Sequence, residues 1–163
     1  MNNYEKAMAK LEEKFGNYKD NVLGLATVAI ETNSKGAPRP VVRDVDAYYE
    51  DGAFYLTTNA QSNKVLQIAQ NNEVAIAVNF EWFTATGTGE NLGWVMKSEN
   101  AELRTKLRKA FEAWYDKANN EKDENLCILK IELKDGTLNI NHGETMIYYD
   151  FASKNATIKG KEV

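Results

Sequence analysis

The stretch Tyr55-Leu56-Thr57-Thr58-Asn59-Ala60-Gln61-Ser62-Asn63-Lys64 carries the chain from a predicted strand into a predicted helix. The strand ends in two threonine hydroxyls, and the first turn of the helix carries Ser62 and Lys64. The first amides of a helix have no partners inside it, and the helix dipole places partial positive charge there. Hydroxyls and an ammonium at this point indicate a site for an anion such as a phosphate. The alternative is an ordinary helix start, with Ser62 as the N-cap and Lys64 in solvent.

Length and composition indicate one compact domain. The chain has 163 residues, of which 43% are apolar and 27% charged, as in ordinary globular proteins. The net charge is −4, so we expect no nucleic-acid or membrane partner, and any anion site must be local. The single cysteine, Cys127, cannot form a disulfide framework, and no segment is apolar over the length that a membrane span needs. We therefore expect a cytoplasmic protein.

The hydrophobic pattern predicts a mainly β fold, an antiparallel barrel with flanking helices. Apolar residues at helical spacing predict helices over residues 3–15 and 62–70 and a long one from Leu103 to Ala118. Short runs rich in β-branched residues, separated by tight turns, predict the strands. These strands cover residues 22–32, 38–49, 53–58, 73–80, 83–91, 126–133, 137–141 and 146–151. The Asp135-Gly136 pair is interpreted as the turn of a hairpin.

Few side chains in this sequence offer catalytic chemistry of their own. The one histidine, His142, follows a strand, and with one cysteine there is no zinc cluster, thiol–imidazole pair or serine triad. Gly87-Thr88-Gly89 falls within a strand and is interpreted as a bulge or as a close approach of the backbone to a ligand. An anion site in such a chain indicates that a bound cofactor carries the chemistry.

A second basic element lies in Gly36-Ala37-Pro38-Arg39-Pro40-Val41-Val42-Arg43. Arg39 and Arg43 are four residues apart on a predicted strand, so we expect both on one face. The planar fork of arginine suits a phosphate. Pro38 and Pro40 cannot donate to a sheet, so this part of the strand is predicted to be an edge or the mouth of a loop. The alternative is that both arginines are surface charges.

Four motifs, in order, resemble those of the pyridoxamine 5′-phosphate oxidase-like family. They are Gly36-x-Pro38-Arg39-Pro40-Val41, the strand after Asp51-Gly52, Thr57-Thr58-(three residues)-Ser62-x-Lys64, and Gln67-Ile68-(two residues)-Asn71-Asn72-x-Val74. The resemblance covers roughly residues 22–92, and the later helix and strands look like the smaller general-stress-protein branch. It implies a Greek-key-like, FMN-binding split β-barrel, with residues 1–163 as a single domain. It also implies a homodimer with FMN in a groove that both subunits share.

The same resemblance implies which residues contact FMN. The segment Arg39-Pro40-Val41-Val42 would lie along the flavin and reach its phosphate. Thr57-Thr58 would contact the ribityl chain and the ring edge, while Ser62 and Lys64 would hold the phosphate. Trp82 lies near the place where the oxidases have a flavin-contacting glutamine.

Departures from the oxidases limit what the resemblance implies about activity. The oxidases have a lysine where this chain has Arg43-Asp44, and Ser-Arg-Lys where it has Ser62-Asn63-Lys64. Their C-terminal tryptophan and arginine-histidine elements, which bind the vitamin substrate, have no match here. We therefore expect an FMN-dependent oxidoreductase with NADH or NADPH as donor and a small acceptor, rather than a pyridoxamine phosphate oxidase. The alternatives are a non-catalytic protein that stores or senses FMN or a related phosphorylated ligand, and a barrel that holds F420 or haem instead, with His142 as the one histidine.

Overall fold

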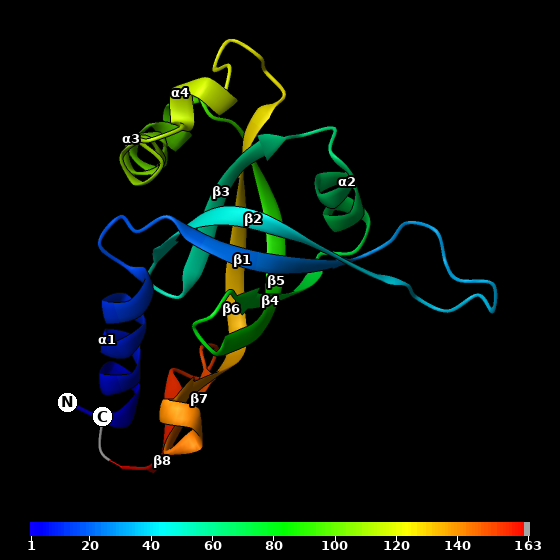
Figure 1. Cartoon of the computed structure of the whole chain (residues 1–163). Helices are drawn as coiled ribbons and strands as arrows, with labels where there is room; N and C mark the ends of the chain where they lie inside the picture. Colours follow the sequence, from blue (N-terminus) through cyan, green and yellow to red (C-terminus); the bar gives the residue numbers. More distant parts are fainter. Residues whose placement is uncertain (162–163) are drawn as a thin grey trace.

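The computed structural model describes residues 1–161 and contains one antiparallel sheet that closes into a barrel (Figure 1). The strand order is β3-β2-β1-β4-β5-β6-β7-β8, and β3 also pairs with β6. This last pairing closes six strands into the barrel, so the predicted mainly β, split-barrel fold class is confirmed. The strands are β1 (Asn21–Val28), β2 (Pro40–Glu50), β3 (Ala53–Asn59), β4 (Glu73–Val78), β5 (Phe83–Trp94), β6 (Leu126–Ile140), β7 (Thr145–Asp150) and β8 (Asn155–Gly160).

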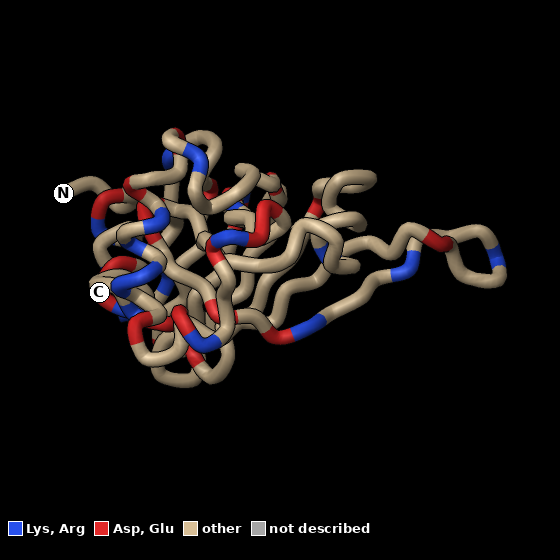
Figure 2. Tube along the Cα trace, turned by 90° about the horizontal axis from the view of Figure 1, so that it is seen from above, with Lys and Arg blue, Asp and Glu red and all other residues tan. Residues whose placement is uncertain are grey.

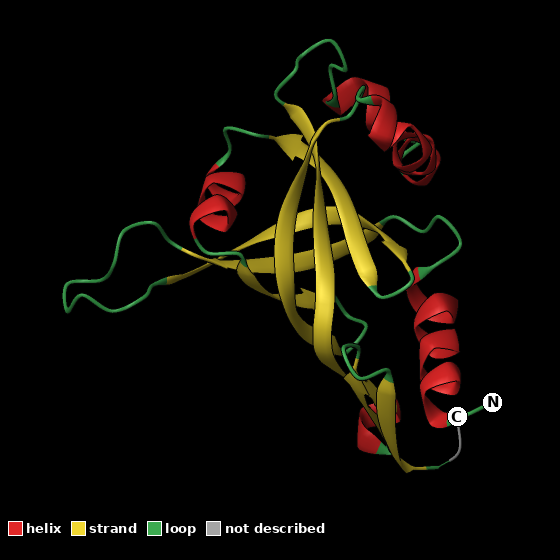
Figure 3. Ribbon diagram, turned by 180° about the vertical axis from the view of Figure 1, so that it is seen from behind, coloured by secondary structure: helices red, strands yellow, loops and turns green. Residues whose placement is uncertain are grey.

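Four α-helices lie outside the barrel, as Figure 3 shows. They are α1 (Asn3–Phe15), α2 (Asn63–Gln70), α3 (Ala101–Ala110) and α4 (Tyr115–Ala118), with short 3₁₀ turns at Ser98–Asn100 and Asn141–Gly143. In Figure 1, α1 runs beside the end of the barrel that carries β7 and β8, and α3 and α4 lie at the opposite end. No helix among residues 1–161 is long and apolar enough to cross a membrane.

Two apolar clusters hold these elements together. The first fills the barrel, where Phe15 of α1 packs on Phe83 with ring centroids 5.4 Å apart, and Leu11 of the same helix is fully buried. The second joins the outer face of β2 and β6 to α3 through Tyr48, Leu107 and further buried residues. The α3–α4 region is therefore anchored to the strands that turn out to flank the candidate site.

Strand β6 corrects the prediction of a hairpin at Asp135-Gly136. The strand runs unbroken from Leu126 to Ile140, and Gly136 pairs with Ala85 on one side and Tyr149 on the other. A Cβ on Gly136 would lie 3.0 Å from the Phe83 ring. This glycine thus permits close packing inside a strand, and its presence does not mark a turn.

Three further features differ from the sequence prediction. The helix expected from Leu103 to Ala118 is broken between α3 and α4, where Phe111 and Trp114 stack with ring centroids 4.6 Å apart. Burying both rings against the second cluster requires a turn there. Strand β8 was not predicted. The strands predicted over residues 22–32 and 38–49 are shorter on the side of their connection, because residues 29–39 form an arm that projects from the barrel between β1 and β2 (Figure 2). Residues 30–40 are all exposed.

The glycines of β5 position α2. The register between β5 and β6 shifts between Thr86 and Gly87, which agrees with the bulge, one of the two interpretations of these glycines. A Cβ on Gly87 would overlap the Glu132 carbonyl oxygen, and one on Gly89 would lie 2.9 Å from the Ile68 side chain of α2. The missing side chain at Gly89 lets α2 pack closely on the barrel, and this packing fixes where the first turn of α2 begins.

Candidate functional site

The candidate site lies where β2 and β3 diverge. The two strands pair only over Tyr48–Glu50 and Ala53–Tyr55. Beyond this point β2 continues toward Pro40 along β1, while β3 continues to Asn59 along β6. Each strand therefore keeps an edge without a strand partner on the side of the split. This separation opens the barrel wall to a ligand.

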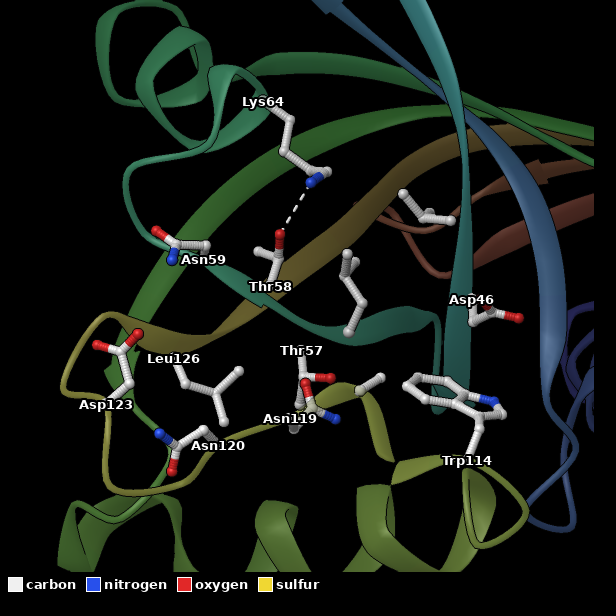
Figure 4. Close-up of a pocket in the computed structure, with 13 residues that line it drawn as sticks. Asp46, Thr57, Thr58, Asn59, Lys64, Trp114, Asn119, Asn120, Asp123 and Leu126 are labelled. Carbon is white, nitrogen blue, oxygen red and sulfur yellow. Dashed lines mark hydrogen bonds between the residues drawn. The ribbon is translucent and has the colours of Figure 1, made fainter. Parts of the chain in front are cut away.

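A pocket of about 440 Å³ occupies this split (Figure 4). Its volume falls in the usual range for small-molecule and cofactor sites, about 300–1,000 Å³. The split strands, the first turn of α2 and the segment between α3 and β6 all contribute to the lining. The lining residues are Val45, Asp46, Leu56, Thr57, Thr58, Asn59, Lys64, Trp114, Ala118, Asn119, Asn120, Asp123 and Leu126.

Two cations without acidic partners lie at one end of the site: Lys64 lines the pocket, and Arg43 lies close to it on β2 but outside the lining. Lys64 Nζ donates to Thr58 Oγ1 at 2.8 Å, and Arg43 donates to Thr27 Oγ1 at 2.7 Å and to Gln67 Oε1 at 2.9 Å. Burial lowers the pKa of both basic groups, and the charge of Arg43 lowers the pKa of Lys64 further. Within residues 1–161 neither group has a carboxylate within 4.0 Å. Partly buried charges are normally paired, so this end is prepared for an anion.

Buried polar atoms without partners belong to two lining residues, Thr57 and Asn119, and to two residues close to the lining, Ser62 and Asp20. Thr57 Oγ1, Ser62 Oγ, Asn119 Nδ2 and Asp20 Oδ1 are buried, and none has a hydrogen-bond partner among the described residues. Most buried polar atoms in folded proteins are paired, because an unpaired one costs desolvation free energy. Ser62 occupies the N-cap position of α2 but makes no side-chain capping bond. The interpretation of Ser62 as an ordinary N-cap is therefore not supported, and its buried hydroxyl has no partner among the described residues.

The opposite end of the pocket is acidic. Asp46 lines it from β2, next to Trp114 (Figure 4). The indole nitrogen of Trp114 donates to Asp20 Oδ2 at 2.7 Å. Burial, together with the nearby Asp20 carboxylate, raises the pKa of Asp46 to about 6. The pocket thus has a cationic end at α2 and an acidic end at Trp114.

Glu121 fixes the segment that forms the outer wall of the pocket. Its carboxylate accepts from Arg104 at 2.6 and 2.8 Å, from Arg108 at 2.9 Å and from the Tyr115 hydroxyl at 3.1 Å. Its carbonyl accepts from Trp94 Nε1 at 2.9 Å. The hydrogen bond from Arg104, followed by those from Arg108 and Tyr115, lowers the pKa of Glu121 to about 2. This network holds Asn119, Asn120 and Asp123, which flank Glu121, against the split.

The structure brings some of the predicted site residues together and separates others. Thr57, Thr58 and Lys64 line the pocket, and Ser62 lies two residues before Lys64. Arg39 precedes β2 on the exposed arm, Pro40 and Val42 are exposed, and Val41 is partly buried; none of these four lines the pocket. Trp82 is 66% exposed in the turn between β4 and β5, with its ring centroid 6.3 Å from that of His142, and it too lies outside the pocket. Their contacts with a cofactor stay predictions.

The sequence did not identify Asp46, Trp114 or Asn119 as site residues. Trp114 and Asn119 lie more than 50 residues from Thr57 along the chain, so only the fold shows that they share a pocket. The sequence identifies Arg43 as a basic residue of a predicted strand, but it does not predict the hydrogen bond from Arg43 to Gln67 of α2. The sequence pattern does indicate which face Asp46 occupies. It lies between the buried residues Val45 and Ala47 on β2, so its side chain projects from the opposite face of the strand.

Residues 6–163 match the sequence profile of the family described as Pyridoxamine 5'-phosphate oxidase like. The chain belongs to this family. The match covers nearly the whole chain, so the resemblance seen in the motifs is confirmed and extends beyond them. No match was found among curated proteins.

Solved structures share the fold of this family member at low sequence identity. A pyridoxamine 5'-phosphate oxidase-related, FMN binding protein from Nostoc punctiforme is 18% identical, with a TM-score of 0.57 over 100% of this chain and 98% of that one. General Stress Protein 26 from Bacillus anthracis is 19% identical, with a TM-score of 0.56 over 77% and 91%. A heme binding protein from Mycobacterium smegmatis is 16% identical, with a TM-score of 0.61 over 90% and 59%. At these identities the likeness shows the fold alone.

The Glu121 network predicts a loss of stability in acid. The folded-state pKa is depressed from 4.5 to about 2, so Glu121 stabilises the protein fully above pH 4.5 and the contribution is lost as the pH falls toward 2. Because the carboxylate is partly exposed, we expect only about 1 kcal/mol. Glu121→Gln should lower the free energy of unfolding by this amount at pH 7 and by less at pH 3. Urea unfolding at both values measures the difference, with the exposed Glu124→Gln in the same segment as control. Equal stability of wild type and Glu121→Gln at pH 7 would contradict the assignment.

Proposed function

We propose that this protein binds FMN in the split between β2 and β3, with the phosphate at the first turn of α2. The observation that carries the proposal is the pair of partly buried cations, Arg43 and Lys64, without acidic partners. The unpartnered hydroxyls of Thr57 and Ser62 lie on the same elements and can donate to phosphate or ribityl oxygens. A phosphate would satisfy both cations and the first amides of α2 at once. The residues present therefore fit a phosphorylated ligand.

FMN fits this pocket better than haem does. No histidine, cysteine or methionine lines the described pocket, so the lining supplies no usual axial ligand for haem iron. His142 lies in the 3₁₀ turn beside Trp82 and is absent from the lining. Membership of a family that includes FMN binding relatives adds to this preference for a flavin phosphate.

We further propose that the protein is an oxidoreductase. A bound flavin supplies hydride and electron transfer, and the protein supplies binding, orientation and electrostatics. Here Arg43, Lys64 and Thr57 would bind, while Leu56 and Trp114 would exclude water. The second candidate is a non-catalytic FMN carrier or sensor. It is favoured by the wall that Trp114 and residues 119–123 of the same chain build over the pocket, which leaves less room for a second molecule.

Lys64→Ala should weaken the binding of FMN far more than that of riboflavin. A charge-assisted hydrogen bond contributes about 1.5–3 kcal/mol, so the affinity for FMN should fall about ten- to a hundred-fold. Riboflavin lacks the phosphate, so its affinity should change little. Quenching of flavin fluorescence measures both dissociation constants. Lys35→Ala, on the tip of the exposed arm, is the matched control and should leave both ligands unaffected. Equal losses for FMN and riboflavin would rule out a phosphate role for Lys64.

The two candidate functions differ in whether the bound flavin can be reduced. We expect NADH or NADPH, added without oxygen, to bleach the flavin absorbance near ~450 nm within the turnover time of ordinary enzymes, on the order of 0.1 s. Dithionite reduction of the same sample is the control that shows the flavin to be reducible. Bleaching by dithionite, with no change after either nicotinamide over an hour, would favour the carrier or sensor.

We propose that the protein forms a homodimer through the outer face of its sheet, with FMN at the interface. An open groove there is lined by small and apolar residues. They include Gly24, Ala26, Val42, Ala75, Ala77, Thr84 and Thr86. Val42 is 69% exposed, and Phe80 in the β4–β5 turn is 97% exposed. A second copy would bury these side chains, and β2 would carry the interface to the edge of the pocket.

The mass in solution should be near twice 18.4 kDa. Ala77→Arg places a large charge on the proposed interface and should yield a monomer, because a buried unpaired charge is costly. The control is Ala9→Arg on the exposed side of α1, which should leave the mass unchanged. Light scattering during size exclusion measures all three proteins. A wild-type monomer that still holds FMN would contradict the shared interface.

A further inference from the structure

Two carboxyl groups meet at the end of the pocket opposite Lys64. Asp46 lines the pocket from β2, and Asp20 lies just before β1, two residues from Val22, which is the cross-strand partner of Asp46. Figure 4 shows Asp46 and Trp114 together, well away from Lys64 and Thr58. Within residues 1–161 neither carboxyl forms an ion pair. The acidic end of the site therefore has no basic group to neutralise it.

Asp20 is held in place by Trp114. Its Oδ2 accepts from the indole N–H at 2.7 Å, and the indole ring stacks on Phe111 at 4.6 Å. Its other oxygen, Oδ1, is buried and has no partner among the described atoms. A buried carboxylate oxygen needs a donor, and the adjacent Asp46 can supply one only if it carries a proton.

The surroundings favour such a proton on Asp46. Burial contributes most to raising its pKa to about 6, followed by the charge of Asp20 and the hydrogen bond to it. The other charged groups on the same strand or in the pocket lining are Asp44, Asp123 and Lys64. Lys64 lies at the far end of the pocket and the remaining two groups are acidic, so no cation beside Asp46 favours a second negative charge here.

We propose that Asp46 is the specificity-determining residue at this end of the pocket: it shares one proton with Asp20 and accepts a hydrogen bond from an N–H group of the bound ligand. Once its O–H is given to Asp20 Oδ1, the second oxygen of Asp46 is an acceptor at the pocket wall. The inference rests on the proposed function, since a flavin combines a phosphate with one ring N–H of this kind. The ligand class is a phosphate joined to a nitrogen heterocycle that carries an N–H donor.

A shared proton makes ligand binding depend on pH. A ligand over the pocket removes water from both carboxyls and so favours the protonated pair further. Above the pKa of Asp46, binding requires the uptake of a proton, and the affinity decreases. In Asp46→Asn, the amide N–H₂ replaces the proton toward Asp20 and the amide oxygen replaces the acceptor. This variant should therefore bind like the protonated wild type at every pH.

The test is FMN and riboflavin binding between pH 5.5 and 8.5 for wild type, Asp46→Asn and Asp46→Leu. We expect wild type and Asp46→Asn to agree at pH 5.5. At pH 8.5 wild type should bind about three- to ten-fold more weakly than Asp46→Asn for both flavins, an excess of roughly 0.6–1.4 kcal/mol. Riboflavin excludes titration of the ligand phosphate as the cause. Asp46→Leu has no acceptor and should bind about ten-fold more weakly throughout. Parallel pH profiles for wild type and Asp46→Asn, or wild-type affinity in Asp46→Leu, would overturn the proposal.

Thermal unfolding without ligand separates this inference from FMN binding itself. The folded-state pKa of Asp46 is raised from 3.8 to about 6, so the folded state binds more protons in this window and its stability falls as the pH rises through it. Asp46→Asn should thus gain about 2–4 °C in Tm relative to wild type between pH 4 and pH 7. If Asp46→Asn shows this gain but no variant binds a flavin, the result would support the shared proton. It would contradict both the proposed FMN binding and the role of Asp46 in ligand binding. If the difference in Tm between wild type and Asp46→Asn were the same at every pH, the hypothesis of a shared proton would be wrong.

Discussion

Strands β2 and β3 pair over only three residues, Tyr48–Glu50 with Ala53–Tyr55, before they part. The barrel nevertheless closes, because β3 pairs along its whole length with β6. The site depends on this combination. If β2 and β3 stayed paired, Asp46 and Thr57 would lie on one continuous wall with no space between them. Because they diverge, two strand edges and the first turn of α2 face one pocket, while the core of the barrel stays intact.

The electrostatics of the pocket follow from which elements reach each end. Arg43 and Lys64 come from neighbouring points on β2 and α2, and both are partly buried without a carboxylate in the described chain. Asp46 and Asp20 come from the other side of the split, where Trp114 fixes Asp20. The overall charge of −4 gives no hint of this separation. A ligand with an anionic end and a polar ring satisfies both ends, whereas a uniformly charged ligand does not.

The sequence predicts those parts of the site that are contiguous. Thr57, Thr58 and Lys64 lie within eight residues of each other, so a strand–turn–helix pattern was enough to bring them together. Gly89 and Gly136 both lie within strands, but the missing side chain makes room for Ile68 of α2 at Gly89 and for the Phe83 ring at Gly136. Local patterns cannot separate such cases, because the neighbours are distant in the chain. For the same reason the contact between Asp20 and Trp114, 94 residues apart, was not predicted.

The two sides of the pocket are stabilised by different interactions. The strands and α2 are anchored in apolar packing, with Leu56, Ile68 and Val74 in the main core. The outer wall between α3 and β6 combines the packing of Trp114 on the second apolar cluster with charged hydrogen bonds that converge on Glu121 and hold residues 119–123. Polar networks near the surface have lower free energies of local opening than a packed core. Residues 119–123 are therefore the part of the wall that we expect to open at the lowest free energy, and a ligand that enters the split past them would leave the barrel intact.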